Sequence, residues 1–177
     1  IGGGTYSVPR AWIDRGTGPI TVAEIDPEVT RTAVQQFWMT PDGITILDED
    51  ARSALLRRPQ ARYDVIVGDA FGYIAVPAHL ITHEFFQLVR SRLTADGVFL
   101  MNVIDFPERL QALGAITSTL QSVFSSVEIW TVESPPVVGE QRVFVLVAGD
   151  RPTDFSSLAV PAPDPTRFAA LAEDFTS

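Results

Sequence analysis

Three glycines near the start of the sequence, followed at a distance by an acid, have the types and spacing of a nucleoside site. Ile1 precedes Gly2, Gly3 and Gly4, and a helix-length segment then leads to an apolar run, residues 20–25, that carries Glu24 near its end. Glycines let the backbone approach a ligand closely, because they lack Cβ and tolerate positive φ. A carboxylate at a strand tip can accept two hydrogen bonds from a ribose diol. These features predict an adenosine derivative bound to an open α/β sheet.

Two other interpretations of these residues stay open. A tight turn needs glycines whether or not it binds a ligand. An NAD site would use Gly2, Gly4 and an acid at the spacing of Glu24, but Ser7 stands where its third small residue is expected.

The elements that would position these residues alternate along the chain. We expect strands, rich in β-branched and apolar residues, over residues 20–25, 44–47, 63–69, 97–104, 127–132 and 142–148. Helices are predicted from Pro27 and over residues 51–56, 80–93 and 107–124. This alternation indicates a mostly parallel sheet with helices on both faces. The last two strands have no helix between them and should pair antiparallel at one edge.

We therefore expect a nucleoside-binding α/β domain over residues 1–149 and a proline-rich tail over residues 150–177. The tail should end in a short helix carrying Phe168, Leu171 and Phe175. Ile1 has the character of a last strand residue, because a glycine loop of this kind is fed by a central strand. We expect that this first strand is truncated in the given sequence.

Composition excludes several kinds of chemistry and of partner. The 177 residues are 46% hydrophobic, as in a packed globular protein, and carry a formal net charge of −9. This charge argues against nucleic acid as a partner and favours cationic small molecules such as polyamines. All thirteen basic residues are arginines and cysteine is absent, which removes lysine and thiolate chemistry. With no apolar run long enough for a membrane span and no signal peptide, we expect a soluble, cytoplasmic protein.

Six motifs in a fixed order resemble those of one protein family. They are residues 1–4 (Ile-Gly-Gly-Gly), 22–27 (Val-Ala-Glu-Ile-Asp-Pro), 50–52 (Asp-Ala-Arg), 63–69 (Tyr-Asp-Val-Ile-Val-Gly-Asp), 79–86 (His-Leu-Ile-Thr-His-Glu-Phe-Phe) and 93–98 (Leu-Thr-Ala-Asp-Gly-Val). Over roughly the first two thirds of the chain, the sequence is similar to the spermidine synthase (polyamine aminopropyltransferase) family. The resemblance implies the Rossmann-like, seven-stranded fold of S-adenosylmethionine-dependent methyltransferases.

The resemblance also assigns roles to residues. The glycine loop, with Thr5 after it, would hold the thioether end of the nucleoside. Glu24 would bind the ribose, and Asp50 would accept from the adenine amino group. Ile25 and Ala51 are expected to contact the nucleoside as well. Asp69 would serve the attacking amine and also lie against the nucleoside.

The chemistry agrees with a catalytic role for Asp69. A sulfonium carries its own leaving group, so the enzyme mainly aligns an amine and keeps it unprotonated. An alkylammonium has a pKa near ~10, so a carboxylate must bind the cation and help remove its proton. As alternatives, Asp69 could be a structural loop acid and Asp50 a helix cap, whereas Asp26 is a better cap than Glu24.

Two departures from the family pattern bear on function. Thr5 stands where the family usually has an acid that faces the cationic aminopropyl group, and the loop after Asp69 lacks the usual second acid. The small N-terminal β domain that helps the family build oligomers is not in the sequence, although a homodimer stays among the expected partners. Three functions therefore remain: aminopropyl transfer from decarboxylated S-adenosylmethionine, methyl transfer from S-adenosylmethionine, or noncatalytic binding of a nucleoside such as methylthioadenosine.

The remaining candidates are side chains near the predicted site. His79 and His83 lack an HExxH order and a third ligand, so we expect them to be solvated or capping and predict no metal site. Tyr73 is the predicted substrate-binding aromatic, while Phe85 and Phe86 fit a core position as well as a ligand wall. We expect no tightly bound cofactor, only the S-adenosylmethionine-type nucleoside as co-substrate, with a polyamine as the second small molecule.

Overall fold

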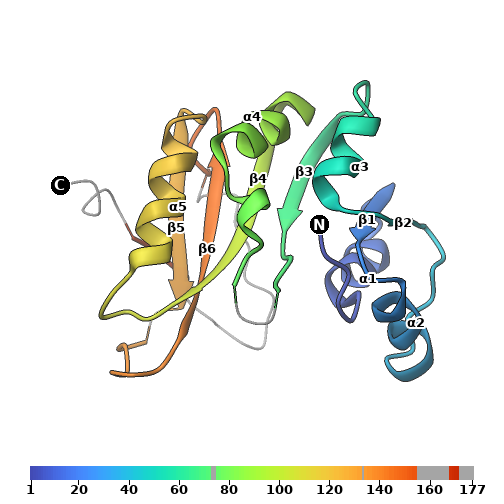
Figure 1. The fold of residues 1–177 in the computed structure, drawn as a ribbon, viewed down its shortest axis with the longest axis horizontal. Coiled ribbons are helices and arrows are strands. Elements are labelled where there is room, and N and C mark those ends of the chain that lie inside the picture. The colour runs from blue at the N-terminus through green and yellow to red at the C-terminus, as the bar shows by residue number, and fades with distance from the viewer. Residues whose placement is uncertain (73–74, 133, 155–167, 172–177) are drawn as a thin grey trace.

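The computed structural model describes residues 1–72, 75–132, 134–154 and 168–171. The helices are α1 (Ser7–Asp14), α2 (Pro27–Gln36), α3 (Ala51–Arg57), α4 (His83–Arg92) and α5 (Gln111–Gln121), with a 3₁₀ turn at Ala78–Leu80. The strands are β1 (Ile20–Glu24), β2 (Ile44–Asp48), β3 (Tyr63–Gly68), β4 (Leu93–Asp105), β5 (Ser126–Val132), β6 (Arg142–Gly149) and β7 (Phe168–Leu171). Figure 1 shows β1 and β2 with α1 and α2 on one side, and the larger sheet on the other.

The strands form two sheets joined through the first residues of the chain. One sheet has five strands in the order β3-β4-β6-β5-β7, and the other pairs β1 with β2. The backbone of Ile1 bonds to Val67 and Asp69 at the end of β3, and Gly2 donates to the carbonyl oxygen of Ala23 in β1 at 2.9 Å. Ile1 thus bonds to the residue before Gly68 and to the residue after it, and this pattern of hydrogen bonds is typical of parallel pairing. Residues 1 and 2 therefore lie between the two sheets (Figure 1).

The expected single, mostly parallel seven-stranded sheet differs from the described arrangement. Parallel pairing occurs for β1–β2 and β3–β4, whereas β4–β6, β5–β6 and β5–β7 are antiparallel. The α/β character and the antiparallel β5–β6 pair are confirmed. This pair is not confined to one edge, because β6 inserts between β4 and β5 and leaves the outer side of β5 to β7.

The predicted C-terminal helix is wrong for the part of it that the structure describes. Phe168–Leu171 is strand β7 and pairs with Val132 to Ile129 of β5. A short apolar run fits a helix or a strand equally well, and here the unpaired edge of β5 selects the strand. Phe175 lies outside the described residues, and the domain boundary at residue 149 stays a prediction.

Two helices begin later than predicted because local capping sets their first turn. The Thr82 side chain accepts a hydrogen bond from the N–H of Phe85, so α4 begins at His83 rather than at Leu80. The buried Asp105 carboxylate accepts from the N–H of Phe106, which follows it, and from the N–H of Leu113, in the first turn of α5. The segment between them forms a turn, and α5 begins after it at Gln111. The helix-length segment after the glycines is confirmed as α1.

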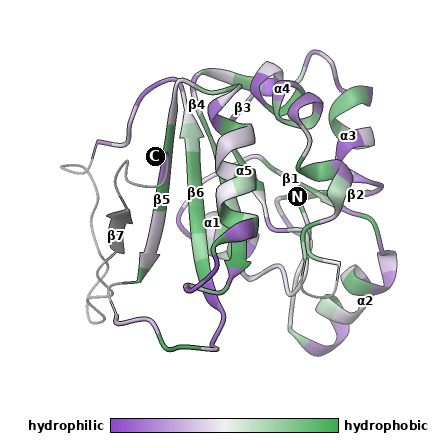
Figure 2. Ribbon diagram, turned by 60° about the vertical axis from the view of Figure 1, so that its left-hand side comes forward, coloured by the Kyte–Doolittle hydropathy of each residue, from purple (hydrophilic) through white to green (hydrophobic). Residues whose placement is uncertain are grey.

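The main core lies between the five-stranded sheet and the helices α4 and α5. Phe85, Phe86, Phe99 and Phe124 form a row in it, with successive ring centroids 6.1, 5.9 and 6.5 Å apart. Phe85 and Phe86 are fully buried there, so the core interpretation of these two residues is confirmed. Figure 2 shows hydrophobic residues concentrated along β4 and β6. Within the described part of the chain, no helix has the length and apolarity to cross a bilayer.

Candidate functional site

The predicted site residues lie at the carboxyl ends of neighbouring strands. Asp50 follows β2, Glu24 ends β1, Gly2 lies between the sheets and Asp69 follows β3. Parallel strands end at the same edge of a sheet, so these residues come in that order along one edge. In open α/β sheets this edge is where ligands bind.

The glycines differ in what surrounds them. Gly2 has φ +84°, and a Cβ placed on it would lie 2.7 Å from the carbonyl oxygen of Asp69. A Cβ on Gly3 would lie 2.5 Å from the ring of Tyr6, which is fully buried and whose hydroxyl is 2.7 Å from that of Thr30. Gly4 has φ +52° and no atom within 4 Å of its Cβ position. Gly2 and Gly3 therefore pack the loop against the protein, and Gly4 leaves open space.

This difference predicts unequal effects of alanine at two positions that share positive φ. Gly4→Ala should cost only the left-handed backbone strain, about 1–2 kcal/mol of unfolding free energy. Gly2→Ala should cost more, because its Cβ also collides with backbone that cannot rotate away. Urea unfolding of both variants measures the difference. Equal destabilisation would contradict the close packing of Gly2 on Asp69.

Glu24 ties the tip of β1 to the glycine loop. It is buried, with 7% of its surface exposed. One carboxylate oxygen accepts from the N–H of Gly3 at 2.8 Å and the other from the N–H of Asp26 at 2.9 Å. Asp26 caps α2 by accepting from the N–H of Glu28, which confirms the prediction that Asp26 is the better cap. These two bonds leave further lone pairs on the carboxylate oxygens unused.

Ile25 is an apolar side chain left in solvent beside this acid. It is 67% exposed, although it directly follows the buried Glu24 at the same sheet edge. An isolated exposed isoleucine needs no explanation, but this one lies where the site residues gather. Its side chain could cover the face of a planar base.

Asp50 acts as a cap and also has a second partner. One oxygen accepts from the N–H of Ser53 at 3.0 Å, which shows that the capping interpretation of Asp50 is correct. The other lies 2.7 Å from Nε2 of His79. Burial would raise the pKa of Asp50, but the hydrogen bonds from His79 and Ser53 together bring this pKa below its ordinary value of 3.8. Ala51, buried at the first position of α3, has a backbone N–H that no helical carbonyl can accept.

Asp69 is exposed and is held by one side chain that the sequence analysis missed. Its Oδ1 accepts from the side-chain amide of Asn102, on β4, at 2.7 Å. Asn102 is a single polar residue between the buried Met101 and Val103, which is the signal that could have identified it. The structure therefore brings Asp69, Asn102 and Gly2 together.

The other predicted residues have different outcomes. Thr5 is exposed, and its hydroxyl donates to that of Ser7 at 3.2 Å. Tyr73 lies outside the described residues. His83 contacts the hydroxyl of Ser122 at 2.8 Å. Among the described residues, no group of three or more His, Cys, Asp or Glu side chains is placed to hold a metal ion.

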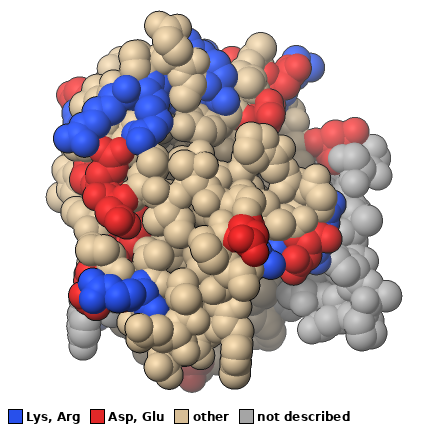
Figure 3. All heavy atoms as spheres, turned by 90° about the vertical axis from the view of Figure 1, so that its right-hand side faces the viewer, with Lys and Arg blue, Asp and Glu red and all other residues tan. Residues whose placement is uncertain are grey.

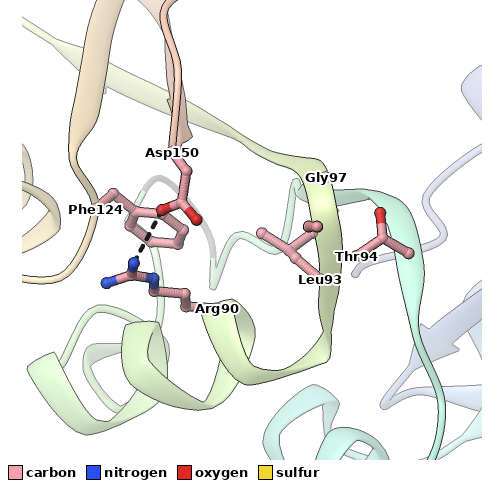
Figure 4. Close-up of a pocket in the computed structure, with 7 residues that line it drawn as sticks. Arg90, Leu93, Thr94, Gly97, Phe124 and Asp150 are labelled. Atoms are coloured by element: carbon pink, nitrogen blue, oxygen red, sulfur yellow. Dashed lines mark hydrogen bonds and ion pairs between the residues drawn. The ribbon is translucent and has the colours of Figure 1, made fainter.

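The pocket shown in Figure 4 lies away from these residues. It has a volume of about 170 Å³ and is lined by Arg90, Leu93, Thr94, Ala95, Gly97, Phe124 and Asp150, with an Arg90–Asp150 ion pair at 2.9 Å. It lies at the start of β4, at the sheet edge opposite Asp69. Sites for small molecules usually exceed ~300 Å³, so this pocket is too small for a nucleoside.

Charged side chains on the β1–β2 side of the molecule occur mainly as mixed groups. Figure 3 shows arginines next to acidic residues at the upper left of this face. Among the ion pairs of the described residues, Arg57 and Arg58 both pair with Glu49, at 2.9 and 2.6 Å. Such pairing leaves less unbalanced positive charge for a phosphate backbone.

Solved structures with the same fold include two transferase-related proteins. A probable spermidine synthase from Corynebacterium glutamicum gives a TM-score of 0.74 at 23% identity, covering 89% of this chain and 57% of that one. Human methyltransferase-like protein 13, solved in complex with SAH, gives 0.69 at 24% identity, covering 90% and 73%. These likenesses show a methyltransferase-like α/β fold.

Sequence comparison identifies relatives among transferases. An N-terminal histidine N-methyltransferase from Emericella nidulans is 33% identical over 143 residues, 78% of this chain and 25% of the relative. A probable polyamine aminopropyl transferase from Bifidobacterium longum is 32% identical over 117 residues, 66% of this chain and 26% of the relative. The chain thus spans about a quarter of the length of these two relatives. Residues 3–157 match the spermine/spermidine synthase domain, so the chain belongs to the spermine/spermidine synthase family.

Proposed function

We propose that this chain binds a sulfonium nucleoside along the carboxyl edge of its strands and transfers an alkyl group from it to an amine, with aminopropyl transfer as the family reaction. The observation that carries the proposal is the order of Asp50, Glu24, the glycine loop and Asp69 along one edge. Adenine, ribose, sulfonium and acceptor amine follow each other in the same order in the reacting molecules. The family membership and the SAH complex of a structural neighbour support this proposal.

The nucleoside end would use a base subsite and a ribose subsite. At the base, Asp50 would accept from the adenine amino group, the N–H of Ala51 would donate to a ring nitrogen, and Ile25 would cover one face. At the ribose, the carboxylate of Glu24 has about four acceptor positions, of which the bonds from Gly3 and Asp26 use two. The remaining two suit the 2′ and 3′ hydroxyls.

The reacting end would use the open loop and Asp69. Gly4 leaves space beside the backbone for the thioether group. The amine nitrogen attacks the carbon beside the sulfonium, the C–S bond breaks with its electron pair going to sulfur, and a neutral thioether leaves. Asp69 first binds the acceptor as an ammonium and then takes its proton, while the amide of Asn102 holds the carboxylate in place.

Calorimetry with methylthioadenosine, S-adenosylmethionine and its decarboxylated form tests the binding part of the proposal. Mass spectrometry of products formed with putrescine and with other amines tests the transfer part. We expect binding of at least one of the three nucleosides. Failure to bind any of them would refute the proposal, and binding without any product would favour a noncatalytic nucleoside-binding domain.

A second candidate, methyl transfer, is favoured by the residues beside the loop. A decarboxylated donor carries an ammonium group that needs an anion, but Thr5 and Ser7 present only hydroxyl groups there. S-adenosylmethionine also carries an ammonium group, but its own carboxylate balances that charge, and neutral hydroxyls can donate hydrogen bonds to the carboxylate. The Emericella nidulans relative is named a methyltransferase, which agrees with this candidate.

Replacing Thr5 by an acid should change the preferred donor. We expect the wild-type chain to bind S-adenosylmethionine more tightly than the decarboxylated form, and Thr5→Asp to shift the ratio of the two affinities about tenfold or more toward the decarboxylated form, through a charge-assisted contact. Thr17→Asp, at another exposed threonine, is the control and should leave the ratio unchanged. An unchanged ratio in Thr5→Asp would remove Thr5 from the donor site.

A further inference from the structure

Residues 79–82, in the segment between β3 and α4, make three polar contacts with the start of α3. Nε2 of His79 lies 2.7 Å from the carboxylate of Asp50. The guanidinium of Arg52 donates to the carbonyl oxygen of His79 at 3.3 Å and to the hydroxyl of Thr82 at 3.5 Å. The contacts join residues 27 to 30 positions apart in the sequence. They place an imidazole directly on the acid that the proposed function assigns to adenine.

These contacts determine how the Asp50 carboxylate is oriented. An ionised carboxylate only accepts hydrogen bonds, so Nε2 of His79 carries the proton in this contact. The N–H of Ser53 holds one oxygen and His79 holds the other, so neither oxygen can rotate freely. A carboxylate fixed at both oxygens still has acceptor positions for one further donor, such as an exocyclic amino group.

We propose that His79 is a positioning residue that acts through Asp50 to make the base subsite select a 6-aminopurine over a 6-oxopurine. This inference rests on the proposed function. A 6-oxo group presents a hydrogen-bond acceptor where the 6-amino group presents donors. Its oxygen would therefore lie against the carboxylate oxygen of Asp50, and two acceptors repel each other. Without His79 the carboxylate could turn away, and discrimination between the two bases would fall.

A merely structural role for His79 would have a different signature. The side chains of His79 and Asp50 are 50% and 26% exposed, and polar contacts at such exposure contribute little to stability. We therefore expect His79→Ala to lower Tm by no more than about 4 °C. Its main effect should be on base selection.

The experiment compares the affinities of methylthioadenosine and methylthioinosine, which differ at position 6 of the base. We expect the wild-type chain to prefer methylthioadenosine by about tenfold or more, and His79→Ala to reduce this preference to about threefold or less. His79→Gln, whose amide nitrogen can replace Nε2 as a donor, should restore it. His83→Ala is the matched control, because His83 is a nearby histidine at the start of α4 that contacts Ser122 instead of Asp50, and it should keep the wild-type preference.

A double-variant comparison tests whether His79 acts through Asp50. Asp50→Asn should lose the preference, and adding His79→Ala to Asp50→Asn should change it no further. If His79→Ala keeps the wild-type preference, or if His83→Ala loses as much, this inference is overturned while nucleoside binding stands. If the wild-type chain binds neither of these two nucleosides, nor S-adenosylmethionine or its decarboxylated form, the proposed function fails as well.

Discussion

Asp69→Asn should retain nucleoside binding and lower the single-turnover rate of alkyl transfer by roughly a hundredfold or more. Asp69 is exposed at the end of β3, beside Gly2, with one oxygen held by Asn102. The asparagine oxygen can still accept from Asn102, so the loop should keep its arrangement. An amide cannot bind an ammonium by charge or accept its proton, so only the reaction should suffer.

Asp64→Asn is a matched control for this variant. Asp64 is also an exposed acid of the β3 segment, and it also accepts from a polar side chain of β4, the hydroxyl of Thr94, at 3.0 Å. It lies at the other end of the strand, so its replacement should leave both binding and rate unchanged. A structural role for Asp69 would instead lower Tm and reduce binding and rate in proportion. An Asp69→Asn protein with the wild-type rate would end the assignment of Asp69 as the catalytic carboxylate that takes the proton of the amine.

The sequence predicted the shared sheet edge because strand ends are visible in local patterns. Glu24 and Asp69 each end an apolar run, and strands that run parallel bring such ends together. The glycines before them need no long-range information either, since positive φ and missing Cβ atoms are properties of the residue itself. The close contact of Gly2 with Asp69 was not itself predicted, because it depends on how the strands are placed side by side.

Contacts between distant side chains were beyond local patterns. His79 reaches Asp50 across 29 positions, and Asn102 reaches Asp69 across 33. Both contacts depend on the three-dimensional placement of the segment after β3 and of strand β4. The periodicity of apolar residues in the sequence carries no information about that placement. The expected position of the antiparallel pair at one edge of the sheet was wrong for the same reason. Strand β6 inserts between β4 and β5, and the pattern of a short apolar strand does not indicate which neighbours it will pair with.

Glu24→Ala should weaken nucleoside binding by about 1.5–3 kcal/mol, through lost charge-assisted hydrogen bonds to the ribose. The structure adds a second consequence, because the same carboxylate accepts from the N–H groups of Gly3 and Asp26. Leaving these two donors without their acceptor should also lower the free energy of unfolding. Affinity alone would therefore not separate a ligand contact from a loop that has lost its shape.

Two further variants separate the two effects. Asp26→Ala removes the cap of α2 and should cost about 0.5–2 kcal/mol of stability while leaving nucleoside affinity nearly unchanged. Glu24→Asp keeps the charge on a shorter side chain, so it should lose loop contacts but retain part of the attraction for hydroxyl donors. Calorimetry with methylthioadenosine and urea unfolding on all three variants give the comparison. If Glu24→Ala loses stability as Asp26→Ala does, yet binds the nucleoside as tightly as wild type, Glu24 serves the loop and another group must hold the ribose.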